Sequence, residues 1–105
     1  MLVPQDLLNE ITQRLKDEFH PEKILLFGSQ AWGNPDESSD IDILIVTSKS
    51  SEKVAKKTAR AHRVLRGLGI SKDIIFRTKV EYETNVTFPS SLEYKIEKEG
   101  NLLYG

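Results

Sequence analysis

The sequence contains no cysteine and no long hydrophobic run. Without cysteine, disulfide bonds, thiolate zinc sites and thiol catalysis are all excluded. No stretch approaches the roughly 18 consecutive apolar residues of a membrane-spanning helix. The first residues, MLVPQDLLNEITQ, also lack the basic head and apolar core of a secretory leader. These absences predict a cytoplasmic protein that works in a reducing environment and without a membrane.

An excess of charge of either sign is also missing. Lysine and arginine total 15 against 16 aspartate and glutamate, which leaves a formal net charge of -1. A chain with so small a net charge has no overall field that would attract nucleic acid or an anionic membrane, so we expect no direct nucleic-acid partner. Any function that depends on charge must come from local clusters. The length of 105 residues fits one domain, and we expect residues 1–105 to form it.

Apolar residues recur at helical spacing in two segments. The first should end at His20, because Pro21 disfavours the helical conformation of the residue before it. Its apolar positions are Leu7, Ile11, Leu15 and Phe19. The inward stripe of the second is Val54, Thr58, Ala61, Leu65 and Leu68, and Gly67 and Gly69 end this helix. Residues 80–85 and 91–100 are weaker helical candidates.

Four short segments are predicted strands: 23–27, 40–46, 72–77 and 101–104. The strand, long helix and strand between residues 40 and 77 indicate a crossover that joins parallel neighbours. The order of elements therefore predicts an α+β fold, in which a small mixed sheet of about four strands is flanked by helices.

The first of these strands runs into Gly28-Ser29 and a polar loop that extends to residue 39. A glycine directly after a strand lets the backbone approach a ligand closely. The serine hydroxyl and free backbone N–H groups can then hold an anion. This turn is therefore a candidate phosphate site.

Asp40 and Asp42 head the next strand, where side chains alternate between faces, so both carboxylates point the same way. They are about 6.6 to 6.8 Å apart along the strand, and magnesium pairs in phosphoryl-transfer sites lie about 3.5 to 4 Å apart. Two carboxylates at this spacing can bracket two ions. Asp73 begins the parallel neighbour, about 4.7 to 4.9 Å away, and can add a third carboxylate. Three such acids need a divalent cation to offset their repulsion.

Each motif has an ordinary structural explanation when taken alone. An Asp-x-Asp pair most often lies at a solvated strand edge or loop boundary, and Gly-Ser after a strand is weaker evidence still. Their order, their spacing and the aspartate that heads the next strand together favour a site for metal ions and a nucleotide.

The three segments GSQAWG, SDIDILIV and KDIIF resemble the pattern of the minimal nucleotidyltransferase (MNT) family of the DNA polymerase beta-like nucleotidyltransferase superfamily. That pattern is Gly-Ser, a short loop, Asp-x-Asp and a later acidic residue. The resemblance implies that Gly28 and Ser29 bind the triphosphate of ATP. It also implies that Asp40, Asp42 and Asp73 are catalytic and bind two Mg²⁺ ions.

The resemblance further implies a role. Small members of this family lack a helical acceptor lobe, pair with a helical HEPN-type protein as antitoxin to its toxin, and in some cases transfer AMP to a tyrosine of that partner. An Mg-dependent protein adenylyltransferase is thus the first hypothesis. The alternatives are a non-catalytic nucleotide-binding subunit that neutralises its partner by steric contact, and a small-molecule (aminoglycoside-like) nucleotidyltransferase with a separate helical subunit. The oligomeric state stays open.

The chain departs from the commonest form of the family at Gln30 and Trp32, where many relatives carry arginine. One hypothesis is that basic residues of the second helix replace these charges if that helix begins near the site; the alternative is a solvated face. Those residues are Lys53, Lys56, Lys57 and Arg60. Trp32 either stacks on a base or partner, or covers the edge of the core. His20 and His62 lack a metal-ligand pattern.

Overall fold

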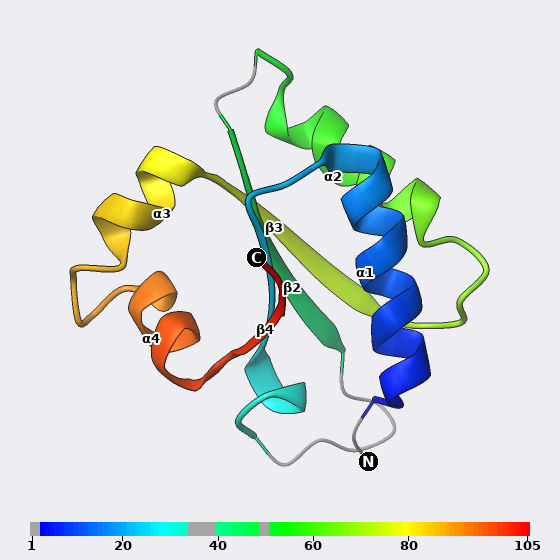
Figure 1. The fold of residues 1–105 in the computed structure, drawn as a ribbon, viewed down its shortest axis with the longest axis horizontal. Coiled ribbons are helices and arrows are strands. Elements are labelled where there is room, and N and C mark those ends of the chain that lie inside the picture. Colours follow the sequence, from blue (N-terminus) through cyan, green and yellow to red (C-terminus); the bar gives the residue numbers. More distant parts are fainter. Residues whose placement is uncertain (1–2, 34–39, 49–50) are drawn as a thin grey trace.

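The computed structural model describes residues 3–33, 40–48 and 51–105. A four-stranded sheet is flanked by helices (Figure 1), which confirms the predicted α+β class. The elements in chain order are α1 (Gln5–Phe19), β1 (Lys23–Phe27), the 3-10 helix η1 (Gly28–Gln30), β2 (Ile41–Thr47), α2 (Val54–Val64), β3 (Lys72–Thr78), α3 (Lys79–Asn85), α4 (Leu92–Glu99) and β4 (Asn101–Tyr104). Within the described ranges, no helix combines the length and apolarity needed to cross a membrane.

The strands lie in the order β3-β2-β1-β4. β1 is antiparallel to both of its neighbours, β2 and β4. β2 and β3 are parallel and are joined through α2, as the strand-helix-strand order predicts. This topology brings the end of β1 and the beginnings of β2 and β3 to the same end of the sheet.

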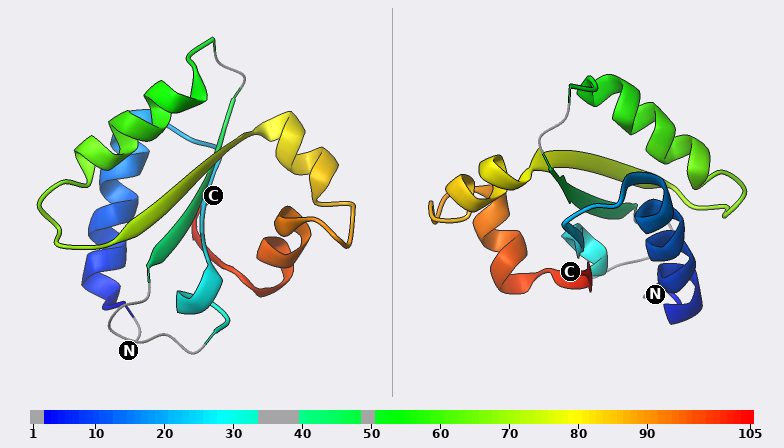
Figure 2. Two further views of the ribbon diagram at one scale, coloured as in Figure 1. Left: turned by 180° about the vertical axis from the view of Figure 1, so that it is seen from behind. Right: turned by 45° about the horizontal axis from the view of Figure 1, so that its top comes forward.

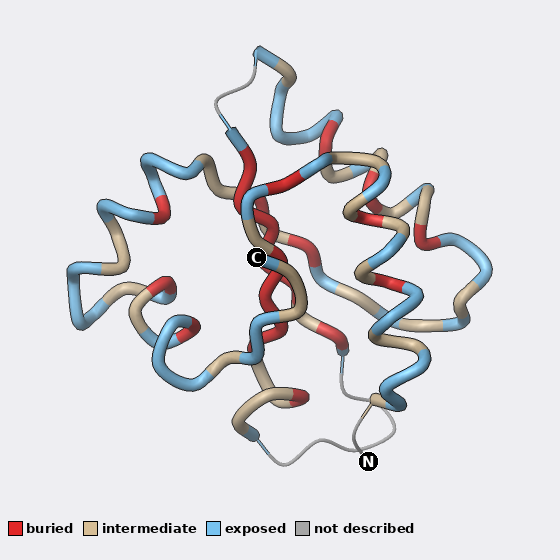
Figure 3. Tube along the Cα trace, viewed as in Figure 1, coloured by how far each residue is buried: buried red, intermediate tan, exposed pale blue. Residues whose placement is uncertain are grey.

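Helices cover both faces of the sheet. α1 and α2 pack on one face, and α3 and α4 lie on the other (Figures 1 and 2). In β2, Ile43 and Ile45 belong to the core under α1 and α2, whereas Leu44 and Val46 belong to the core under α3 and α4. A strand buried on both faces reads as a continuous apolar run, which explains the sequence ILIV. Figure 3 shows this burial concentrated along the central strands.

His20 and Pro21 end α1. His20 caps the helix in the left-handed conformation, with φ 46°, and its backbone N–H donates to the Lys16 carbonyl. Pro21 then turns the chain into β1, as expected from its effect on the preceding residue.

The inward stripe predicted for α2 is partly wrong. Ala61 and Leu65 are buried, but the Val54 side chain is 58% exposed. Lys57 is 5% exposed instead, and its ammonium lies 5.3 Å from the centre of the Phe76 ring. A lysine can do this because its long aliphatic stem covers apolar surface while the charge rests against the aromatic face.

Candidate active site

The turn after β1 is built tightly around Gly28. This residue has φ +75°, and its carbonyl accepts hydrogen bonds from the N–H groups of Ala31 (2.9 Å) and Trp32 (3.0 Å). A Cβ at Gly28 would lie 2.9 Å from Cγ of Asp42 and would overlap its carboxylate. Both the left-handed backbone and the approach of Asp42 therefore require glycine here.

Gly33 closes the same turn against Ser29. The Gly33 N–H donates to the Ser29 carbonyl at 3.2 Å, and a Cβ at Gly33 would lie 2.8 Å from the Cα of Ser29. A side chain at Gly33 would push the turn open. The whole segment GSQAWG is thus folded into one compact loop beside β2.

Asp42 and Asp73 are direct neighbours in the sheet. Their Cα atoms are register partners in the parallel β2–β3 pair, and Phe27 is the partner of Asp42 on the β1 side. Two residues further along each strand, Leu44 and Ile75 pack under α3 and α4. Because strand side chains alternate, Asp42 and Asp73 point to that same face.

Asp40 is held to the start of β3 by Ser71. The Ser71 hydroxyl donates to Oδ1 of Asp40 at 2.5 Å, and the backbone N–H of Ile41 donates to the Ser71 carbonyl at 2.9 Å. Ser71 carries no motif signal in the sequence, and the topology alone reveals its contact with Asp40.

The three carboxylates interact electrostatically. Burial raises the pKa of the Asp42 carboxyl, and the negative charges of Asp73 and then Asp40 raise it further. Within the described residues, no three or more histidine, cysteine, aspartate or glutamate side chains form a ready metal cage. Magnesium does not need one, since it is usually held by one or two carboxylates and by substrate phosphates. An oxygen-only donor set with unbalanced negative charge fits such an ion.

Lys95 of α4 brings a positive charge to the loop that follows β1, and no pattern in the sequence predicts this contact. The Lys95 ammonium lies 4.8 Å from the centre of the Trp32 ring, and this ring lies 6.2 Å from that of Phe27. Gln30 is buried, and its side-chain carbonyl has no hydrogen-bond partner among the described residues. No spacing rule links Lys95 to the Gly-Ser turn, because the packing of α4 beside β1 brings them together.

The hypothesis that the start of α2 supplies charge to this site is wrong. α2 follows the far end of β2, so the part of this strand from Asp42 to Thr47, about 16 to 17 Å long, separates Asp42 from the end of the sheet where Lys53 and Lys56 begin α2. Arg60 is engaged within the fold: it pairs with Glu18 and Glu52, and its guanidinium lies 4.5 Å from the centre of the Phe19 ring.

Comparison with known proteins bears on this geometry. Residues 8–102 match the family model described as a nucleotidyltransferase domain. "Putative protein adenylyltransferase MJ1305" of Methanocaldococcus jannaschii is 29% identical over 92 residues, which cover 86% of this chain and 58% of that protein. "Putative protein adenylyltransferase MJ0141" of the same organism is 36% identical over 61 residues, which cover 53% of this chain and 60% of that protein. The chain thus spans less than two thirds of either relative.

A solved structure is also similar. It is the crystal structure of a putative nucleotidyltransferase from Sulfolobus solfataricus. The TM-score is 0.60 at 30% sequence identity, and the match covers 75% of this chain and 70% of that chain.

Proposed function

The chain belongs to the nucleotidyltransferase domain family, and on this premise we propose that it transfers AMP from ATP to a side chain of a partner protein. The observation that carries the proposal is the packing of the Asp42 carboxylate against Gly28, directly beside Asp73. This arrangement joins a turn suited to phosphate with acids suited to magnesium. The names of the two archaeal relatives support a protein acceptor.

The donor nucleotide is proposed to bind on the Gly28 side of the acids. Backbone N–H groups and the Ser29 hydroxyl of the compact turn can hold phosphate oxygens. Lys95 lies beside this turn, against Trp32, and can supply positive charge to a bound triphosphate. Trp32 is half-buried and leaves part of its ring for contact with the nucleotide.

Asp40, Asp42 and Asp73 are proposed to hold the magnesium ions. When bound, the ions would neutralise these carboxylates and draw charge from the phosphate oxygens of ATP. An acceptor hydroxyl oxygen forms a bond to the α-phosphorus, the bond from that phosphorus to the bridging oxygen breaks, and pyrophosphate leaves. Asp73 is exposed and is the proposed acceptor of the hydroxyl proton.

The partner is proposed to be a HEPN-type toxin, with this chain as its cytoplasmic antitoxin. This finer proposal is supported by the resemblance to minimal nucleotidyltransferases and by the word "protein" in the names of the relatives. It commits the acceptor to a protein rather than a small molecule.

Transfer of label from α-labelled ATP tests the proposal. The chain is incubated with magnesium and the protein encoded beside it, and label is expected on that protein. Asp42→Asn should abolish labelling, whereas Asp17→Asn, an exposed acid on α1, should leave it unchanged. Equal labelling by Asp42→Asn would overturn the catalytic assignment. Full neutralisation of the partner by an Asp40→Asn/Asp42→Asn variant would favour the non-catalytic subunit instead.

A further inference from the structure

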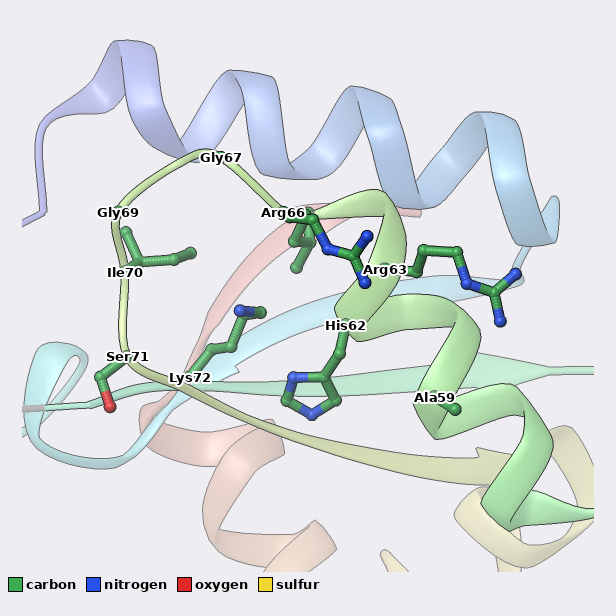
Figure 4. A pocket seen from close by; sticks show the side chains of 10 residues that line it. Ala59, His62, Arg63, Arg66, Gly67, Gly69, Ile70, Ser71 and Lys72 are labelled. Atoms are coloured by element: carbon green, nitrogen blue, oxygen red, sulfur yellow. The ribbon is translucent and has the colours of Figure 1, made fainter.

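A second feature lies at the same end of the sheet as the three acids. It is a pocket of about 700 Å³ between the last turns of α2, the loop 67–71 and the start of β3. Its basic lining residues are His62, Arg63, Arg66 and Lys72. Figure 4 shows His62, Arg66 and Lys72 around one opening between α2 and β3. We call this feature the basic pocket.

The charges of the basic pocket are not neutralised within the described part of the chain. No ion pair there includes Arg63, Arg66 or Lys72, and no aspartate or glutamate lines the pocket. This contrasts with Arg60, one turn before Arg63, which pairs with two glutamates. Because the net charge of the chain is only -1, so much unpaired positive charge is a local feature.

The basic pocket and the acids meet at the start of β3. Ser71 lines the pocket, and its hydroxyl donates to Asp40. Lys72 also lines the pocket, and the next residue is Asp73. Along the sheet, Gly28 lies on one side of Asp42 and β3 lies on the other. Side chains alternate along β3, so Lys72 points to the face covered by α2 and Asp73 points to the opposite face, and the basic pocket meets the acids at the start of this edge strand.

The frame of the basic pocket is held in place by α1. Nη1 of Arg14 donates to the carbonyls of Val64 (3.1 Å) and Arg66 (3.2 Å). Val64 is the last residue of α2 and Arg66 follows it, so both carbonyls lie where helical hydrogen bonds end. Gly67 and Gly69, at φ +90° and +68°, then turn the chain towards β3. A fixed frame reduces the entropy lost when a ligand binds.

We propose that the basic pocket docks an acidic segment of the acceptor protein. This inference rests on the proposed function, because it assigns the docked segment to the acceptor protein. The segment would lie at the β3 edge of the sheet, and the Gly28 turn proposed for ATP follows β1 on the other side of β2. Arginine forks match carboxylates in bidentate geometry, and two arginines line the pocket. Single-stranded nucleic acid is disfavoured because no phenylalanine, tyrosine or tryptophan is among the described residues that line the pocket, which leaves His62 as its one ring for base stacking.

Fluorescence anisotropy of a fluorescein-labelled octaglutamate peptide tests the docking directly, without ATP or magnesium. Arg63→Glu/Arg66→Glu should weaken peptide binding by about tenfold or more at low salt. Both side chains are exposed, so the double substitution removes no buried contact, and circular dichroism melting checks that the fold is kept. Lys53→Glu/Lys56→Glu is the matched control, because it makes the same charge change with exposed residues at the other end of α2.

Two results would overturn the inference. One is equal loss of binding in both double variants, which would mean that overall charge alone attracts the peptide. The other is tighter binding of a labelled RNA octamer than of octaglutamate, which would assign the pocket to nucleic acid. Failure of the wild type to transfer AMP, with the peptide still bound in this pocket-dependent way, would thus refute the proposed reaction and leave the pocket assignment standing.

Discussion

The Asp42 carboxylate occupies the space that a side chain at Gly28 would fill, with its Cγ 2.9 Å from the position of such a Cβ. Gly28 directly follows β1, and Asp42 lies in β2, the antiparallel neighbour of β1, so the pairing of these strands brings the turn at Gly28 against Asp42. The proposed metal and nucleotide functions therefore share one contact.

Gly28→Ala should destabilise the fold and abolish ATP binding. A left-handed non-glycine residue costs about 1 to 2 kcal/mol, and the clash with Asp42 adds to that cost. Gly69→Ala is a matched control, because Gly69 has φ +68° but nothing within 4 Å of its Cβ position. Urea unfolding should give the larger loss for Gly28→Ala, and calorimetry should show loss of ATP binding in that variant alone. Equal losses with intact binding would contradict the role of this contact.

Asp42→Asn should raise stability at neutral pH in the presence of a chelator. Burial, Asp73 and Asp40 all raise the pKa of Asp42, so the wild-type carboxylate carries a cost once it is ionised in the folded state. That cost develops as the pH rises through the raised pKa, and it vanishes below the ordinary value of 3.8. The free energy of unfolding should thus be larger for Asp42→Asn than for the wild type at pH 7, and the two values should converge at low pH.

Added magnesium should make the wild type more stable than Asp42→Asn. The ion would stabilise only the wild type strongly, because the asparagine side chain of the variant lacks the charge that attracts it. Thermal melting with and without magnesium measures this effect. A magnesium response of equal size in both proteins would contradict a role for Asp42 in binding the ion.

Glu93→Gln should lower the free energy of unfolding at pH values above the pKa of the Glu93 carboxyl. Burial alone would raise the pKa of Glu93, but hydrogen bonds from Asn85 and Arg77 and the charge of Arg77 lower it overall. The stabilisation is therefore present above the ordinary value of 4.5 and is lost as the pH falls through the lowered pKa. We expect a loss of roughly 1 to 3 kcal/mol at pH 7 from urea unfolding. Glu99→Gln, at an exposed position, should change little.

Lys95→Ala should weaken ATP binding by about fivefold, because Lys95 is exposed and a charge contact at an exposed side chain contributes up to about 1 kcal/mol. Lys98→Ala is the control, since Lys98 lies on the same helix and its ammonium is 5.5 Å from the centre of the Tyr94 ring, whereas Lys95 is the residue that contacts Trp32. Calorimetric titration with ATP compares the two variants. Equal affinities would assign the triphosphate to the backbone and Ser29 without help from α4.

Local patterns in the sequence were enough to predict the elements and part of the site. Alternation in residues 40–46 predicts a common direction for Asp40 and Asp42, and the strand-helix-strand order predicts that Asp73 begins the adjacent parallel strand, as the register confirms. The catalytic and metal-binding roles of these residues stay predictions.

Contacts between distant elements could not be predicted in this way. Lys57 is buried because Phe76 on another element offers it an aromatic face, and Lys95 reaches Trp32 because α4 packs beside β1. Helical periodicity treats each lysine as an outward residue and contains no information about the partner across the core. Ser71 and Asp40 were missed as a pair for the same reason.

The difference between the two strand pairings also bears on the order in which the molecule assembles. Residues 28–40 connect β1 to β2, whereas the longer segment 48–71, which includes α2, connects β2 to β3. Closing the shorter loop costs less chain entropy, so the contact between Gly28 and Asp42 can form first, and Asp73 joins the acidic group only when β3 pairs with β2.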